Sequence, residues 1–85
     1  MAHVRMYCTH ACPYCHMAAR LLERRGAEVE KIRIDEQPER RAEMRAATGQ
    51  TSVPQIFIGN RHVGGYSDLA QLDLDGTLAA LLAAP

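Results

Sequence analysis

The chain has 85 residues, which leaves room for one small domain and excludes a large catalytic barrel. Ten basic and ten acidic residues give a formal net charge of zero, so we expect neither a nucleic acid nor a membrane as partner. Hydrophobic residues make up 47% of the chain and charged residues 24%, which is typical of globular proteins and excludes a disordered chain.

All three cysteines lie between positions 8 and 15, too close together to cross-link a secreted scaffold. The first residues, MAHVRMY, lack the apolar stretch of a secretory signal. The longest apolar run, Leu78–Ala84, is far shorter than the roughly 18 residues needed to cross a bilayer. We therefore expect a cytoplasmic protein in which clustered thiols are redox-active or metal-binding.

The first part of the chain predicts a strand, a helix and a second strand. His3–Tyr7 has the apolar pattern of a short strand. Pro13 suits the first turn of a helix and Gly26 its end. Between them, apolar or small residues recur at helical spacing at Tyr14, Met17, Ala18, Leu21 and Leu22. The β-branched residues of Glu28–Ile34 predict the second strand.

The middle of the chain predicts a second helix and a hairpin. Glu39–Thr48 forms the helix, and its thin apolar face around Met44 places it at the margin of the sheet. Ile56–Ile58 and His62–Val63 flank a three-residue turn that contains Gly59. The last two strands are therefore antiparallel.

The end of the chain predicts helical structure. Ser67 or Asp68 can cap a short helix that runs to Leu72. A final helical stripe follows at Leu74, Leu78, Leu81 and Leu82. The order β-α-β-α-β-β-α combines a right-handed parallel crossover with a terminal hairpin. It predicts an α/β protein of the thioredoxin-like fold, with a four-stranded mixed sheet flanked by helices in a single domain, residues 1–85.

The segment Cys12-Pro13-Tyr14-Cys15 places two thiols where a strand gives way to a helix. At the N-cap, the Cys12 sulfur would lie over unpaired amides and the positive end of the helix dipole, which favour a thiolate. Cys15, one turn inside, is expected to be more buried, with an ordinary pKa. The two thiols of such a pair have different roles. Cys12 attacks a disulfide sulfur, and Cys15 then attacks the resulting mixed disulfide and releases the substrate thiol.

Two metal-binding alternatives use the same cysteines. A C-x-x-C pair also fits half of a zinc site, which His10 and His16 are near enough to complete, although His16 falls on the polar face of the helix. No second Cys/His pair is present, so we expect no metal. With Cys8, the spacing resembles the cluster motif of radical S-adenosylmethionine enzymes, which need a much longer chain. Cys8 is then a small, half-buried residue that closes the first strand.

Three separated segments resemble the glutaredoxins, specifically the dithiol class with a Cys-Pro-Tyr-Cys site. They are Cys12–Cys15, Thr51–Pro54 before the third strand, and Gly64–Asp68 at the start of the third helix. The resemblance covers nearly the whole chain. It implies the thioredoxin-like fold, Cys12 as nucleophile, Cys15 as resolving thiol and glutathione as cosubstrate.

The resemblance also implies how glutathione binds. It implies a cis Val53-Pro54 bond against the cysteines, with the Val53 backbone pairing to an extended thiol peptide. Gly65 lets the backbone approach a ligand, and the next helix offers Ser67 and Asp68 to the γ-glutamyl group. The glutathione-binding residues implied are Tyr14, Thr51, Ser52, Val53, Pro54, Gly65, Ser67 and Asp68, with Gln50 as a further candidate.

One position departs from the family pattern. Thr9 stands where glutaredoxins commonly carry a lysine or arginine that meets the glycyl carboxylate of glutathione. This weakens the expected contact and part of the activation of Cys12. Gln50 and one of Arg40 or Arg41 are candidates to replace it.

We therefore expect a monomeric glutathione-dependent thiol–disulfide oxidoreductase. Its partners would be glutathione, disulfide-bonded or glutathionylated proteins, and glutathione reductase, reached indirectly through glutathione. Two alternatives stay open at this point. A thioredoxin-like reductase would draw electrons from a dedicated reductase, and a metal or iron–sulfur binding module would carry a bound metal.

Overall fold

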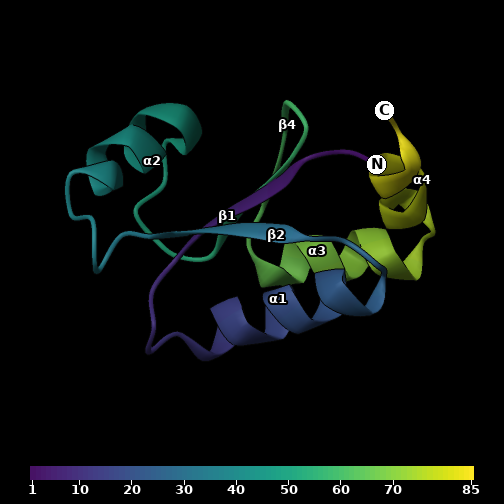
Figure 1. The fold of residues 1–85 in the computed structure, drawn as a ribbon, viewed down its shortest axis with the longest axis horizontal. Helices are drawn as coiled ribbons and strands as arrows, with labels where there is room; N and C mark the ends of the chain where they lie inside the picture. Colours follow the sequence, from purple (N-terminus) through teal and green to yellow (C-terminus); the bar gives the residue numbers. More distant parts are fainter.

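The computed structural model describes residues 1–85 and contains a four-stranded sheet and four helices (Figure 1). In chain order the elements are β1 (Val4–Cys8), α1 (Pro13–Arg24), β2 (Val29–Arg33), α2 (Arg40–Thr48), β3 (Gln55–Ile58), β4 (Arg61–Gly64), α3 (Tyr66–Leu74) and α4 (Thr77–Ala83). None of these helices has both the length and the apolar character needed to span a membrane.

The sheet is mixed, with strand order β2-β1-β3-β4. Strand β1 is parallel to β2, with Val4 opposite Val29, and antiparallel to β3. Strands β3 and β4 form the predicted antiparallel hairpin, with an irregular register between Ile56 and Phe57. The thioredoxin-like fold and the four-stranded mixed sheet expected from the sequence are confirmed.

The larger core lies on the side of the sheet covered by α1, α3 and α4 (Figure 1). Side chains of β1 and β3 that point to this side pack against the apolar stripes of the helices. Fully buried members of this core are Val4, Met6, Ala18, Leu22, Ile56, Leu69 and Leu78. The stripe predicted for the first helix therefore faces the sheet.

A smaller core lies on the opposite side of the sheet, beneath α2. Alternation along β1 sends Tyr7 to this side, where it packs with Ile32, Ile34, Met44 and Phe57. Met44 is the only buried residue of α2. The thin apolar face predicted for this helix is confirmed.

The C-terminal part differs from the predicted order, because two helices follow the hairpin instead of one. Gly76 adopts a φ of +82° between α3 and α4, a left-handed conformation that interrupts the run. Helix α3 also begins at Tyr66, with Gly65 as its N-cap, so the predicted cap at Ser67 or Asp68 is wrong. Asp68 sits one turn inside and reaches back to the Gly65 amide.

Candidate active site

Cys12 is the N-cap of α1, as predicted, and its backbone is extended. Its Sγ accepts a hydrogen bond from the Cys15 N–H at 3.2 Å. Pro13 takes the first helical position, where a missing amide proton costs no hydrogen bond. The sequence thus places a half-buried sulfur directly over the open amide end of the helix.

Cys15 lies one turn further along α1 and is only 2% exposed. Burial in the larger core, together with a hydrogen bond to Cys12, raises the pKa of the Cys15 thiol to about 12. The expectation of an ordinary pKa for this residue is therefore wrong. Cys15 is therefore more deeply buried than Cys12, although the two residues are only three positions apart in the sequence.

The segment before β3 lies against Cys12. The Val53-Pro54 bond is cis, as the resemblance implied, and the Cys12 thiol donates to the Val53 carbonyl with 3.7 Å between Sγ and oxygen. The Val53 N–H donates no hydrogen bond within the protein. Val53 thus presents a free amide beside the sulfur.

A buried glutamine holds this segment in place. Gln55 is 4% exposed, and its side-chain amide donates to the Ser52 carbonyl at 3.0 Å. Its Oε1 accepts a hydrogen bond from His62 Nε2 at 2.7 Å. These contacts tie the loop before β3 to strand β4.

Two glycines bring the start of α3 against the same segment. Gly64 has a φ of +112°, and a Cβ at this position would lie 2.5 Å from Asp68 Oδ2. That carboxylate oxygen accepts the Gly65 N–H at 3.0 Å. A Cβ on Gly65 would lie 3.7 Å from the Pro54 carbonyl oxygen. Gly64 is therefore required by both its backbone conformation and the space beside it, whereas a Cβ at Gly65 would make only an ordinary contact with Pro54.

These three segments enclose a groove of about 190 Å³. Its lining consists of Tyr14, Ser52, Val53, Pro54, Gly65, Tyr66, Ser67 and Asp68. Seven of the nine residues implied for glutathione binding therefore come together, whereas Gln50 and Thr51 lie exposed in the loop after α2 and do not line the groove.

Sequence reasoning missed Tyr66. Its ring lies 6.0 Å from that of Tyr14, centroid to centroid, so the two tyrosines form one wall of the groove. The signal was present, because Tyr66 is in the middle of the Gly64–Asp68 segment. Ser67 and Asp68 next to it have the polar groups that suit an anionic ligand, so the segment was interpreted through these two residues and not through Tyr66.

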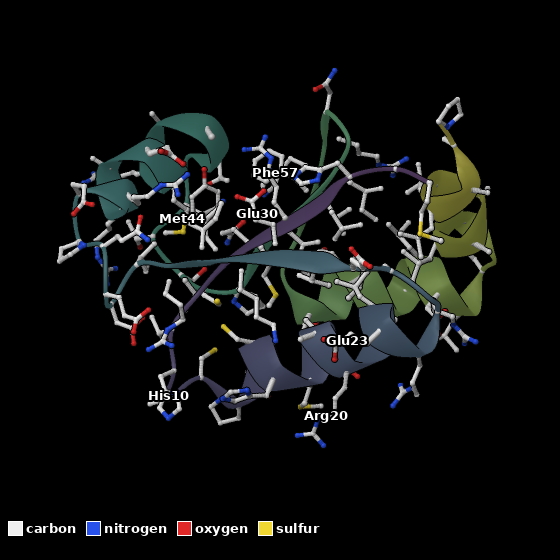
Figure 2. The ribbon with its side chains drawn as sticks, in the orientation of Figure 1. His10, Arg20, Glu23, Glu30, Met44 and Phe57 are labelled. Carbon is white, nitrogen blue, oxygen red and sulfur yellow. The ribbon has the colours of Figure 1, made fainter.

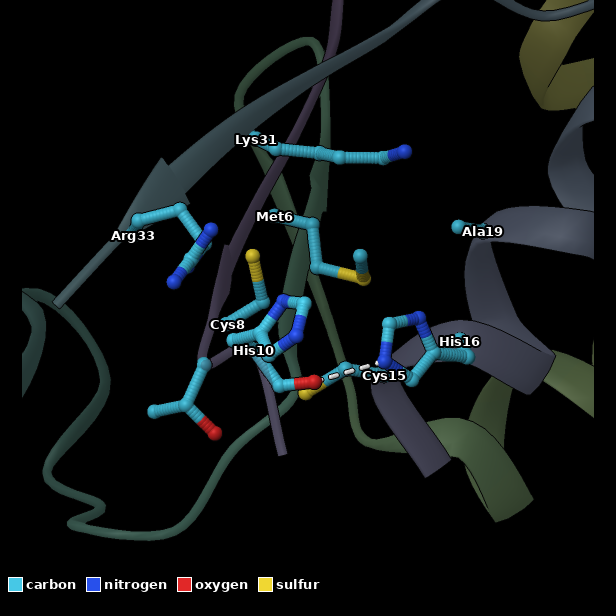
Figure 3. A pocket seen from close by; sticks show the side chains of 9 residues that line it. Met6, Cys8, His10, Cys15, His16, Ala19, Lys31 and Arg33 are labelled. Atoms are coloured by element: carbon cyan, nitrogen blue, oxygen red, sulfur yellow. Dashed lines mark hydrogen bonds between the residues drawn. The ribbon is translucent and has the colours of Figure 1, made fainter. Parts of the chain in front are cut away.

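Cys8 does not reach this groove. It faces a second cavity, of about 200 Å³, together with Cys15, Lys31 and Arg33 (Figure 3). Cys8 is 3% exposed, so the expected half-burial is wrong, because β1 is an inner strand covered by α1. Its burial raises the pKa of the thiol.

The two histidines near the cysteines lie at the surface. His16 Nε2 is 2.7 Å from the His10 carbonyl oxygen, which links α1 to the preceding loop (Figure 3). His10 projects from that loop into solvent (Figure 2). No group of three or more histidine, cysteine or acidic side chains is placed to hold a metal ion.

Arg40 and Arg41, the candidates to replace the cation that is absent at Thr9, differ in their ionic partners. The Arg40 guanidinium donates to Glu43 at 2.9 Å, and Glu43 also accepts the Tyr7 hydroxyl. Arg40 is thus already engaged by a carboxylate. Arg41 is exposed and makes no ion pair.

Comparisons with known proteins agree with this geometry. The family model described as Glutaredoxin matches residues 4–63. A glutaredoxin of Neisseria meningitidis serogroup A is 52% identical over 83 residues, covering 96% of this chain and 98% of that protein. The solution structure of glutaredoxin from Brucella melitensis is similar, with a TM-score of 0.84 and 48% identity over 96% of this chain and 89% of that one. The crystal structure of the buckwheat glutaredoxin–glutathione complex has a TM-score of 0.87 at 28% identity, covering 95% and 76% of the two chains.

Proposed function

Because the chain belongs to the glutaredoxin family of thiol–disulfide oxidoreductases, we propose that it reduces protein disulfides and protein–glutathione mixed disulfides with glutathione as cosubstrate. The observation that carries this proposal is the position of Cys12. Its sulfur caps α1, receives the Cys15 amide, and lies beside the open groove.

In the first step, the Cys12 thiolate attacks the glutathione sulfur of a mixed disulfide. A Cys12–glutathione disulfide forms, and the protein thiolate leaves and takes up a proton. The amide end of α1 supports negative charge on Cys12 before attack. A second glutathione thiolate then attacks the glutathione sulfur, which releases oxidised glutathione and restores Cys12.

The groove is proposed to hold the glutathione part. The free Val53 N–H and its carbonyl would pair with the extended peptide backbone, as an added strand does. The amides at the start of α3, with Ser67, would receive the γ-glutamyl carboxylate, and Asp68 would face its ammonium group. Tyr14 supplies a wall beside the reacting sulfur. Gln50 and Thr51 are proposed to act from the rim, since they lie outside the lining.

Cys15 is proposed to act only when the substrate is a protein disulfide. It would attack Cys12 in the protein mixed disulfide, which leaves a Cys12–Cys15 disulfide and a released protein thiol. Burial and its raised pKa keep Cys15 protonated until Cys12 has reacted. This separates the attacking thiol from the resolving one.

We further propose a monomer that acts in the cytoplasm as one domain, residues 1–85. Three free thiols suit a reducing compartment, in which glutathione reductase would supply electrons through glutathione. A single domain is supported by the two cores, because β1 and β3 contribute side chains to both.

The proposal is tested by the reduction of a small glutathione mixed disulfide coupled to glutathione reductase. Cys12→Ser is expected to abolish activity, because Cys12 contacts Val53 at the groove whereas the other two thiols are buried. Cys15→Ser is expected to keep this activity and to lose the reduction of a protein disulfide. Full activity of Cys12→Ser protein would exclude Cys12 as the nucleophile.

The same assay separates the alternatives. A thioredoxin-like reductase would be reduced by a thioredoxin reductase and not by glutathione. A metal or cluster module would copurify with zinc or iron, and metal analysis of the purified protein detects either one. We expect glutathione to be the effective reductant.

A further inference from the structure

The surface of α1 next to the groove has exposed apolar side chains. Tyr14 is 60% exposed and Met17 is 40% exposed, one helical turn apart. Beyond them lies a hollow of about 220 Å³ lined by Met17, Arg20, Arg24 and Tyr66, which we name the α1 hollow. Tyr66 lines both the groove and the α1 hollow, so the two are neighbours on the surface.

The surface around the α1 hollow has more positive than negative charge. Arg20 and Arg24 are exposed and make no ion pair, and Arg20 points away from the sheet (Figure 2). The acidic residues nearby are engaged elsewhere. Glu23 pairs with Lys31 of β2 at 3.9 Å. Asp73 of α3 pairs with Arg25 at 2.7 Å, and the pKa of its carboxyl is lowered mainly by Arg25 and also by the charge of Arg24. In a chain of zero net charge, this is a local surplus.

We propose that the α1 hollow docks the protein part of the substrate, and that it selects acidic residues near the reacting cysteine. The proposal rests on the proposed function, since it assumes that the reaction takes place at Cys12. Exposed aromatic and methionine side chains suit a partner that changes from substrate to substrate. The two arginines add charge complementarity, which favours encounter and correct orientation.

The length of α1 fixes where the acidic residues should lie. Helix rise places Arg20 about 12 Å and Arg24 about 18 Å along the axis from Cys12. An extended peptide advances about 3.3 Å per residue, so its acidic side chains should stand about four to six residues from the reacting cysteine.

The test compares glutathionylated peptides in a glycine/serine host. Two glutamates, two glutamines or two lysines are placed about four to six residues after the cysteine, or before it. In at least one of these two orders, the glutamate peptide should have a kcat/KM about 5-fold above the glutamine peptide at low salt. The preference should shrink at high salt, because the charges are exposed.

Charge reversal gives the matched control. Arg20→Glu with Arg24→Glu should invert the preference toward the lysine peptide. Arg45→Glu, at an exposed arginine of α2 that makes no ion pair, should keep the preference for glutamate. The small mixed disulfide should be reduced equally by all three proteins, because it does not reach the α1 hollow.

Three results would overturn the proposal. One is equal kcat/KM for the three peptides in both orders, and another is an unchanged preference after reversal of Arg20 and Arg24. The third is a concentration-dependent dimer that the same reversal dissociates, because a second copy would then cover the surface. If the wild type fails to reduce even the small mixed disulfide, the proposed function itself is wrong.

Discussion

Two thiols separated by two residues acquire different chemistry from their surroundings. Cys12 lies outside the first turn of α1, where its sulfur accepts an amide hydrogen bond. Cys15 lies inside that turn and packs into the larger core. The helix therefore exposes one sulfur to substrate and buries the other.

The raised pKa of Cys15 makes its reactivity depend on pH. In Cys12→Ser protein, which loses the hydrogen bond to Cys12 but keeps the burial, alkylation of Cys15 by iodoacetamide should be slow at pH 8 and should still be rising at pH 10, because only the thiolate reacts and burial raises the pKa of the thiol. Peptide mapping by mass spectrometry follows the modification. A plateau below pH 9 would show that Cys15 is not held as a thiol.

At the scale of elements, helix α2 is attached to the smaller core through one side chain. Met44 is its only buried residue, and it completes the smaller core with Tyr7 and Phe57. The larger core, in contrast, receives side chains from α1, α3 and α4. The groove is lined by the start of α1, by Ser52–Pro54 of the loop after α2 and by the start of α3, and it contains no residue of helix α2 itself.

Met44→Ala should therefore destabilise the folded protein. We expect a loss of about 2–5 kcal/mol in the free energy of unfolding, because a fully buried side chain is removed. Arg45→Ala, on the exposed side of α2, should change it by less than about 0.5 kcal/mol. Urea unfolding measures both. Equal effects of the two substitutions would mean that Met44 does not anchor the helix.

At the scale of the whole molecule, the sequence predicted the parts whose signals are local. The strands, the stripe of α1, the cap at Cys12 and the hairpin follow from periodicity and turn residues over short stretches. The assembly of the groove was predicted only from the family resemblance. No local sequence signal shows that Val53 contacts Cys12 or that Gly65 lies near Pro54.

Other features could not be predicted because they depend on tertiary packing. The full burial of Cys8 and the raised pKa of Cys15 both result from β1 being an inner strand beneath α1. The contact between the Tyr66 and Tyr14 rings also depends on tertiary packing, because the two residues are distant in sequence. The break at Gly76 was missed because the leucine stripe passes across it.

The central claim is that the Cys12 sulfur receives glutathione. Cys15→Ser protein mixed with one equivalent of a glutathionylated peptide, without free glutathione, should stop after a single transfer. Intact-mass analysis and peptide mapping should then find one glutathione per chain, on Cys12, and the peptide as a free thiol. Glutathione on Cys8 instead, or an unmodified protein beside an unchanged peptide, would contradict the account.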